Sequence, residues 1–190
     1  MSKANSNFFV GTQGHKEYLG KDVSNFIDSR KSAEDIISER VKNLDTREHI
    51  VKHKKFLSQK EMKIVKKKIK DRTATMEEYK NYSMTLRFNA NRNHAIKEFW
   101  RQERIRVMNN TPTREWTPEQ IKDILAFNKP KFKGKTLHGH HAFSAHKYPH
   151  LAKFHEVIYP ATFQEHFQGW HGGNWKNSLP GKRIKTIKNF

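Results

Sequence analysis

Apolar residues recur at helical spacing through most of the first 110 positions. Met62, Val65 and Ile69, for example, lie three and four positions apart, a spacing that places side chains on one face of an α-helix. Ser/Thr-x-x-Glu capping boxes begin at Ser58 and Thr75 and signal new helix starts. We therefore expect three helices, at 32–56, 59–71 and 76–107. Residues 1–30, where Asn, Ser and Gly alternate with aromatics, are expected to be poorly ordered.

The pattern changes after the Asn-Asn-Thr-Pro segment at 109–112, a composition typical of turns. A short helix is expected next, with Thr117 as N-cap, Pro118 in the first helical position and Gln120 completing the capping box. A basic loop follows, from Lys129 to Lys135. The sequence then predicts strands at 136–143 and 157–159.

A fourth capping box, Thr162 with Glu165, predicts a last short helix that starts at Thr162. The expected fold class is α+β. Two regions are expected: a mainly helical, basic region at 1–110 with no assigned function, and a second domain at 111–190 with a two-stranded hairpin and one packed helix.

The charge is strongly unbalanced, with 38 Lys and Arg against 19 Asp and Glu and a net charge of +19. Such a field attracts polyanions, first nucleic acid and second an anionic membrane. No run of 18 apolar residues is present, so no membrane span is expected. The first 14 residues contain no apolar core of a signal peptide. The chain has no cysteine, so any metal must be held by histidine, carboxylate or water.

Eight of the 12 histidines fall between His138 and His171. Hydrolysis of a phosphodiester needs a water, a base that deprotonates it, and positive charge near the phosphate and the leaving oxygen. Histidine serves both as a neutral metal ligand and as a base near neutral pH. Because neighbouring residues of a strand point to opposite faces, His140 and His141 can serve different tasks.

These motifs resemble the ββα-metal nucleases of the HNH/endonuclease VII superfamily, specifically the GHH-type toxin nucleases. The resemblance covers about residues 116–184, and we find none in 1–110. It rests on five segments: Gly139-His140-His141, Tyr148-Pro149-His150-Leu151-Ala152, Val157-Ile158-Tyr159-Pro160, Glu165-His166 and His171-Gly172-Gly173.

The resemblance implies roles for four histidines around one divalent metal ion. His140 and His166 would be metal ligands, His171 a third ligand or a phosphate contact, and His141 the general base. Many relatives place the two helical histidines four positions apart, whereas here the gap is five. A regular helix would splay them, so either the helix ends early at Gly169 or only one of the two binds metal.

The metal itself stays open at this point, because histidine ligands suit Zn²⁺ or Ni²⁺ while Mg²⁺ or Mn²⁺ could act with water and phosphate ligands. The resemblance also implies DNA as substrate, an acidic cognate immunity protein as partner, and secretion as part of a larger toxin that acts in the cytoplasm of a target cell. Lys176, Asn177 and Arg183, in the glycine-rich tail, are candidate phosphate contacts.

Several features have a simpler interpretation. Four histidines are expected in loops or at the surface: His138, His146, His150 and His155. Glu165 is expected mainly to cap its helix. The lysine-rich run at 63–70 is expected to be the solvent-exposed face of an amphipathic helix. Trp170 and Trp175 could stack on a base or sugar but are more typical of a core.

Two other functions compete with the nuclease. In the first, a basic helical module with a structural, His-ligated metal binds DNA without cutting it. In the second, which is the weaker, the protein is a membrane-active toxin.

Overall fold

The computed structural model describes residues 31–49 and 56–187. The expectation for residues 1–30 lies outside this part of the chain. Four α-helices are described: α2 (Ala33–Val41), α3 (Gln59–Lys70), α4 (Met76–Met108) and α5 (Pro118–Leu125). Each begins at a capping box in which the N-cap hydroxyl and the N3 side chain exchange hydrogen bonds with backbone N–H groups.

The expected helix starts are therefore confirmed, but the expected end of the first helix at residue 56 is wrong. Helix α2 ends at Val41, and Leu44 N–H closes a turn on the Val41 carbonyl. Asp45 then accepts hydrogen bonds from the backbone and guanidinium of Arg47. Such local side-chain bonds to the backbone compete with helix continuation.

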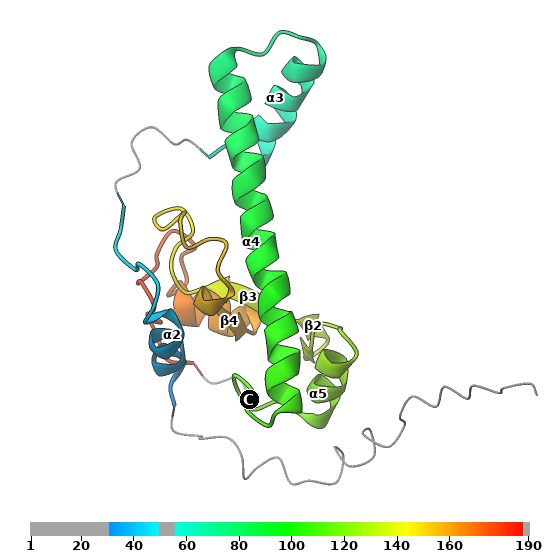
Figure 1. The fold of residues 1–190 in the computed structure, drawn as a ribbon, viewed down its shortest axis with the longest axis vertical. Helices are drawn as coiled ribbons and strands as arrows, with labels where there is room; N and C mark the ends of the chain where they lie inside the picture. The colour runs from blue at the N-terminus through cyan, green and yellow to red at the C-terminus, as the bar shows by residue number, and fades with distance from the viewer. Residues whose placement is uncertain (1–30, 50–55, 188–190) are drawn as a thin grey trace, which may run out of the picture.

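Helix α4 is the longest described helix and runs along the long axis of the molecule (Figure 1). Its 33 residues correspond to about 50 Å of helix. Helix α3 packs beside its N-terminal part, and the two extend away from the rest of the chain as a helical hairpin. Helix α5 packs near the C-terminal end of α4.

Two small antiparallel sheets follow α5. Strands β1 (Lys131–Phe132) and β2 (Lys135–Thr136) form a hairpin within the segment expected to be a basic loop. Strands β3 (His138–His141) and β4 (Ile158–Ala161) pair with His138 opposite Ala161 and His141 opposite Ile158. Strand β3 is shorter than the strand expected at 136–143, and β4 begins and ends later than the strand expected at 157–159. The two nevertheless form the expected hairpin. A short 3₁₀ turn, η2 (His155–Val157), leads into β4.

The last helical element, η3 (Glu165–Trp170), is a π-helix. With β3 and β4 it completes the expected strand–strand–helix arrangement, and the α+β fold class is confirmed.

The main hydrophobic core lies between α2, α4 and the β3–η3 region. Ile37, Phe99, Leu151, Ile158 and Trp170 are among its most deeply buried members. A second cluster, with Val107, Trp116, Ile124 and Leu137, holds α5 against α4. Side chains from both sides of Asn110 thus share these cores, and the N-terminal helices support the β3–β4 hairpin directly.

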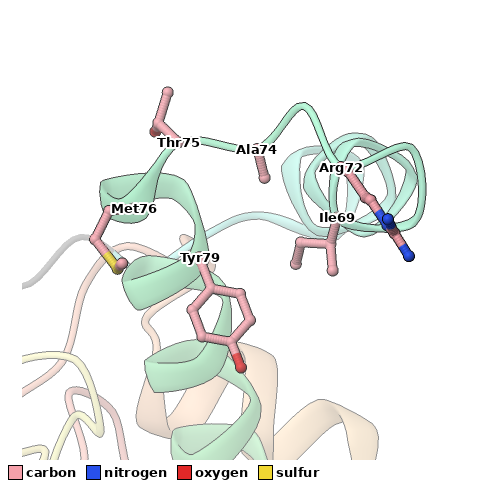
Figure 2. A pocket seen from close by; sticks show the side chains of 6 residues that line it. All are labelled: Ile69, Arg72, Ala74, Thr75, Met76 and Tyr79. Atoms are coloured by element: carbon pink, nitrogen blue, oxygen red, sulfur yellow. The ribbon is translucent and has the colours of Figure 1, made fainter.

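An open pocket marks the junction of α3 and α4, lined by Ile69, Arg72, Ala74, Thr75, Met76 and Tyr79 (Figure 2). It lies at the end of α4 remote from β3 and β4 (Figure 1). None of the described helices combines the length and apolar character needed to cross a bilayer.

Candidate metal centre

Strand β3 presents alternate residues to two different environments. His138 and His140 lie on the side of η3, where both rings contact His166. Gly139 lies against α4: a Cβ atom at this position would come 3.0 Å from Ile96 Cγ2 and 3.2 Å from Ile158 Cγ2. The strand can approach α4 this closely only because residue 139 has no side chain. The alternation expected from the sequence is therefore observed.

The π-helical turn of η3 brings His166 and His171 together despite their five-residue gap. The backbone N–H of His171 donates to the carbonyl of His166 at 3.2 Å, which is the i→i+5 bond of a π-helix. The two ring centroids are 5.0 Å apart. The helix continues to Trp170 rather than ending at Gly169, so the wider turn, not an early helix end, compensates for the extra residue.

His140, His166 and His171 form one cluster, and one nitrogen from each ring lies within 4.8 Å of the others. His140 is 5% exposed and is covered by the Trp170 ring, whose centroid is 4.5 Å away. Elements β3 and η3 together therefore place three nitrogen donors around a common point. This donor set could hold a metal ion.

Hydrogen bonds occupy the second nitrogen of two of these rings. His171 Nδ1 lies 2.6 Å from the carbonyl oxygen of Asn177, and only a protonated Nδ1 can donate to a carbonyl. In the neutral form of this ring, Nε2 is then the nitrogen that carries a free lone pair. His166 Nδ1 lies 3.0 Å from His138 Nδ1, so one of these two nitrogens donates and the other accepts. Such outer partners orient histidine ligands in known metal sites.

Burial keeps two rings of the cluster, those of His140 and His166, neutral near pH 7. Burial, followed by the neighbouring histidines, lowers the pKa of His140 well below 6.5. Burial likewise lowers the pKa of His166 to about 3, with His171 and His138 acting in the same direction. Neutral imidazoles carry the lone pairs that metal coordination requires.

His141 points away from this cluster, toward the loop between β3 and β4. Its Nε2 lies 3.2 Å from the carbonyl oxygen of Ala152, and the residue is 8% exposed. Burial lowers the pKa of His141 to about 4; the Ala152 hydrogen bond opposes this, and the charge of Arg92 adds to it. The ring is therefore neutral at pH 7, with Nε2–H donating and Nδ1 free to accept a proton.

Glu165 has the expected capping role and a second one. Its carboxylate accepts from the Thr162 N–H at 2.8 Å, and its own N–H donates to the Thr162 hydroxyl. Arg114 binds both carboxylate oxygens at 2.9 Å and also donates to the Pro160 carbonyl. This nearly buried pair fixes the start of η3 to the end of β4.

The three candidate phosphate contacts lie in different surroundings. Lys176 is exposed, with its backbone N–H bonded to the Asn174 side chain. Asn177 reaches the cluster through its backbone carbonyl on His171. The guanidinium of Arg183 makes a two-point ion pair with Glu34 in α2 at 2.8 Å. Lys176 and Asn177 are both exposed, whereas Arg183 is partly buried.

Two residues near the cluster were not singled out by sequence reasoning. His138 was expected at the surface or in a loop, but it lies in β3 against His166; its place two positions before His140 on a strand was the available signal. Arg92, on α4, acts electrostatically on His141, and its Nε is buried without a hydrogen-bond partner among the described residues. Nothing local in the sequence marks that position.

A family model matches part of the chain. No curated protein and no solved structure matches the chain. Residues 85–162 match the model of a family described as GHH signature containing HNH/Endo VII superfamily nuclease toxin. The match begins in α4, earlier than expected, which fits the support that Ile96 gives to β3. His166 and His171 follow the matched segment. Residues 85–162, which include Gly139, His140 and His141, are therefore similar to this family of nuclease toxins.

Proposed function

We propose that the protein is a metal-dependent endonuclease that hydrolyses DNA phosphodiester bonds and acts as an antibacterial toxin. The proposal rests on the separation of histidine side chains between the two sides of β3. Nitrogens of three histidine rings converge on one side within 4.8 Å, and a fourth histidine, His141, is held separately by the Ala152 carbonyl.

His140, His166 and His171 would hold one divalent cation. A cation bound there would stabilise the negative charge that develops on the phosphate and on the leaving oxygen. The hydrogen bond of His171 to Asn177 leaves Nε2 as its donor atom. His166 offers Nε2 when its Nδ1–H donates to His138, so metal binding selects that tautomer. Zn²⁺, Ni²⁺, Mn²⁺ and Mg²⁺ are all candidates.

His141 would act as the general base. With Nε2–H directed to Ala152, its Nδ1 takes a proton from the attacking water as the water oxygen bonds to phosphorus. The bond from phosphorus to the 3′ oxygen breaks, and that oxygen takes up a proton from solvent. Loss of a general base typically costs about 10²–10⁴-fold in rate.

Charge supports nucleic acid as the substrate and an acidic protein as the inhibitor. The net charge of +19 favours fast, salt-sensitive association with either polyanion. We further propose that a cognate immunity protein holds the enzyme inactive in the producing cell, and that the chain is delivered as part of a larger secreted toxin into the cytoplasm of a rival bacterium.

A non-catalytic DNA-binding module is the competing proposal. A structural metal site is normally closed by four protein ligands, whereas a catalytic site keeps a position open. The cluster found within residues 31–49 and 56–187 has three histidines, which favours catalysis.

Plasmid nicking separates the two proposals. The purified protein is stripped with chelator and incubated with supercoiled DNA and Mg²⁺, Mn²⁺, Ni²⁺ or Zn²⁺ in turn. We expect nicking with at least one metal and none after chelation. DNA binding without nicking under every metal would overturn the nuclease proposal in favour of the binding module.

A further inference from the structure

Three aromatic rings, one within η3 and one from the segment on either side of it, lie together. The Phe163 and Phe167 centroids are 6.0 Å apart at 26°, and those of Phe167 and Trp175 are 4.8 Å apart at 38°. Phe163 and Trp175 also contact each other, with centroids 6.2 Å apart. We call these three residues the aromatic platform.

The aromatic platform borders the histidine cluster. The Trp175 ring centroid is 5.1 Å from that of His166 and 5.0 Å from that of His171. At the other end of the platform, the Phe163 ring contacts His138, at 6.2 Å. A molecule that lies on the platform is therefore adjacent to the rings that would hold the metal.

Two of the three platform residues, Phe163 and Trp175, are open to solvent, and Phe167 is partly buried. Phe163 and Trp175 are each 50% exposed, whereas Trp170, one turn away, is 1% exposed and belongs to the main core. Single exposed apolar side chains are common, but grouped ones beside a concave or reactive site indicate a ligand surface. A core role, which suits Trp170, does not account for the exposure of Phe163 and Trp175.

Positive charge lies next to the platform. The Nζ of Lys135, in β2, is 5.9 Å from the Phe163 ring centroid. Lys176 follows Trp175 in the chain and is exposed. Aromatic faces flanked by lysines are the pattern by which proteins bind single-stranded nucleic acid, with bases on the rings and phosphates on the cations.

We propose that the aromatic platform stacks an unpaired nucleobase next to the scissile phosphate, so that the preferred substrate is single-stranded or locally unpaired DNA. In a duplex both faces of a base are covered by its neighbours, and stacking on protein requires that the base leave the helix. The proposal rests on the proposed nuclease function for the position of the phosphate, but base stacking itself needs no metal and no cleavage.

Binding to metal-free protein tests the platform directly. Fluorescence anisotropy is measured with three labelled DNAs of equal length: oligothymidylate, the same strand with abasic sites, and a duplex. The abasic strand keeps the phosphates but has no bases to stack. We expect wild-type protein to bind oligothymidylate more tightly than the abasic strand by about 5- to 150-fold, the equivalent of ~1–3 kcal/mol for one stacked base.

Substitutions locate the effect. Trp175→Ala and Phe163→Ala should each reduce the preference for oligothymidylate over the abasic strand, while Trp175→Phe, which keeps a ring, should retain much of it. Tyr79→Ala is the matched control, because Tyr79 is 52% exposed at the remote end of α4 (Figure 2) and should leave the preference unchanged.

Equal wild-type affinity for oligothymidylate and the abasic strand would overturn the platform, as would duplex binding tighter than single-strand binding in the same salt. This comparison needs no variant, so misfolding of Trp175→Ala cannot rescue the proposal. A protein that prefers bases but nicks nothing under any metal would refute the nuclease function and leave the platform standing. A protein that nicks DNA but binds the abasic strand as tightly as oligothymidylate would refute the platform and leave the nuclease function standing.

Discussion

Substitution of Gly139 by alanine should destabilise the protein through a steric conflict with α4. The added Cβ would lie 3.0 and 3.2 Å from two carbons of Ile96 and 3.2 Å from Ile158 Cγ2, whereas ordinary contacts begin near 3.4 Å. Both neighbours are β-branched and stiff about χ1, and both Ile96 carbons are bonded to its Cβ, so no single rotation removes both contacts. The strand or the helix must move.

Overpacking of this kind typically costs about 1–3 kcal/mol. We expect a loss of that size in the free energy of unfolding, measured by urea titration with circular dichroism, and a fall in Tm of roughly 2–4 °C for each kcal/mol. Because His138 and His140 flank Gly139 in β3, metal affinity and nicking should fall too.

Ile96→Ala provides the control, because it removes both of the Ile96 carbons that cause the conflict. In this background Gly139→Ala should cost less than in wild type, with a coupling of about 0.5–3 kcal/mol between the two sites. An unchanged free energy of unfolding for Gly139→Ala, or an equal cost in both backgrounds, would refute the close approach of β3 to α4 as the reason for glycine at this position.

Three further predictions concern stability and the metal centre. Arg114→Met should lower the free energy of unfolding by about 3–5 kcal/mol, because it leaves the buried Glu165 carboxylate without its partner. The metal-free protein should lose stability as pH falls from 6.5 toward 5. The unfolded chain protonates its histidines near pH 6.5, whereas in the folded protein burial lowers the pKa of His141 to about 4 and that of His166 to about 3. His138→Phe should weaken metal binding by about 10–100-fold, and His138→Asn, whose amide oxygen can accept from His166, should restore part of it.

Each of these has a contrary outcome. Arg101→Met, which breaks the exposed pair with Glu98, should cost at most ~1 kcal/mol, so an equal cost for Arg114→Met would contradict the buried pair. A free energy of unfolding that stays flat or rises between pH 6.5 and 5 would contradict the neutral histidines. Unchanged calorimetric metal affinity in His138→Phe would contradict a role for His138 in orienting His166.

Local sequence signals predicted much of this fold. The capping boxes located four helix starts, and the alternation of His140 and His141 across a strand is observed in β3. The end of α2 was missed because it depends on a turn at Leu44 and Asp45, not on helical periodicity. The β1–β2 hairpin was missed because two-residue strands carry no periodic signal.

The sequence named His140, His166 and His171 as candidate metal ligands, and the structure brings these three together, but their geometry was not predicted. The five-residue gap between His166 and His171 looked unfavourable for shared metal binding, because a regular α-helix would point the two rings in different directions. No local motif indicates a π-helical turn. The position of His138 was missed for a different reason: its role appears only when η3 folds back on β3 and places His166 beside it.

We propose separate roles for His140 and His141, and one comparison of variants tests them. Metal content by calorimetric titration, DNA affinity and plasmid nicking are measured together for His140→Ala, His141→Ala and the exposed control His94→Ala. We expect that His141→Ala keeps metal affinity and loses nicking about 10²–10⁴-fold. His140→Ala should lose metal affinity and regain some nicking in excess metal, and all three variants should bind DNA. Wild-type nicking by His141→Ala, or full metal affinity in His140→Ala, would contradict these roles.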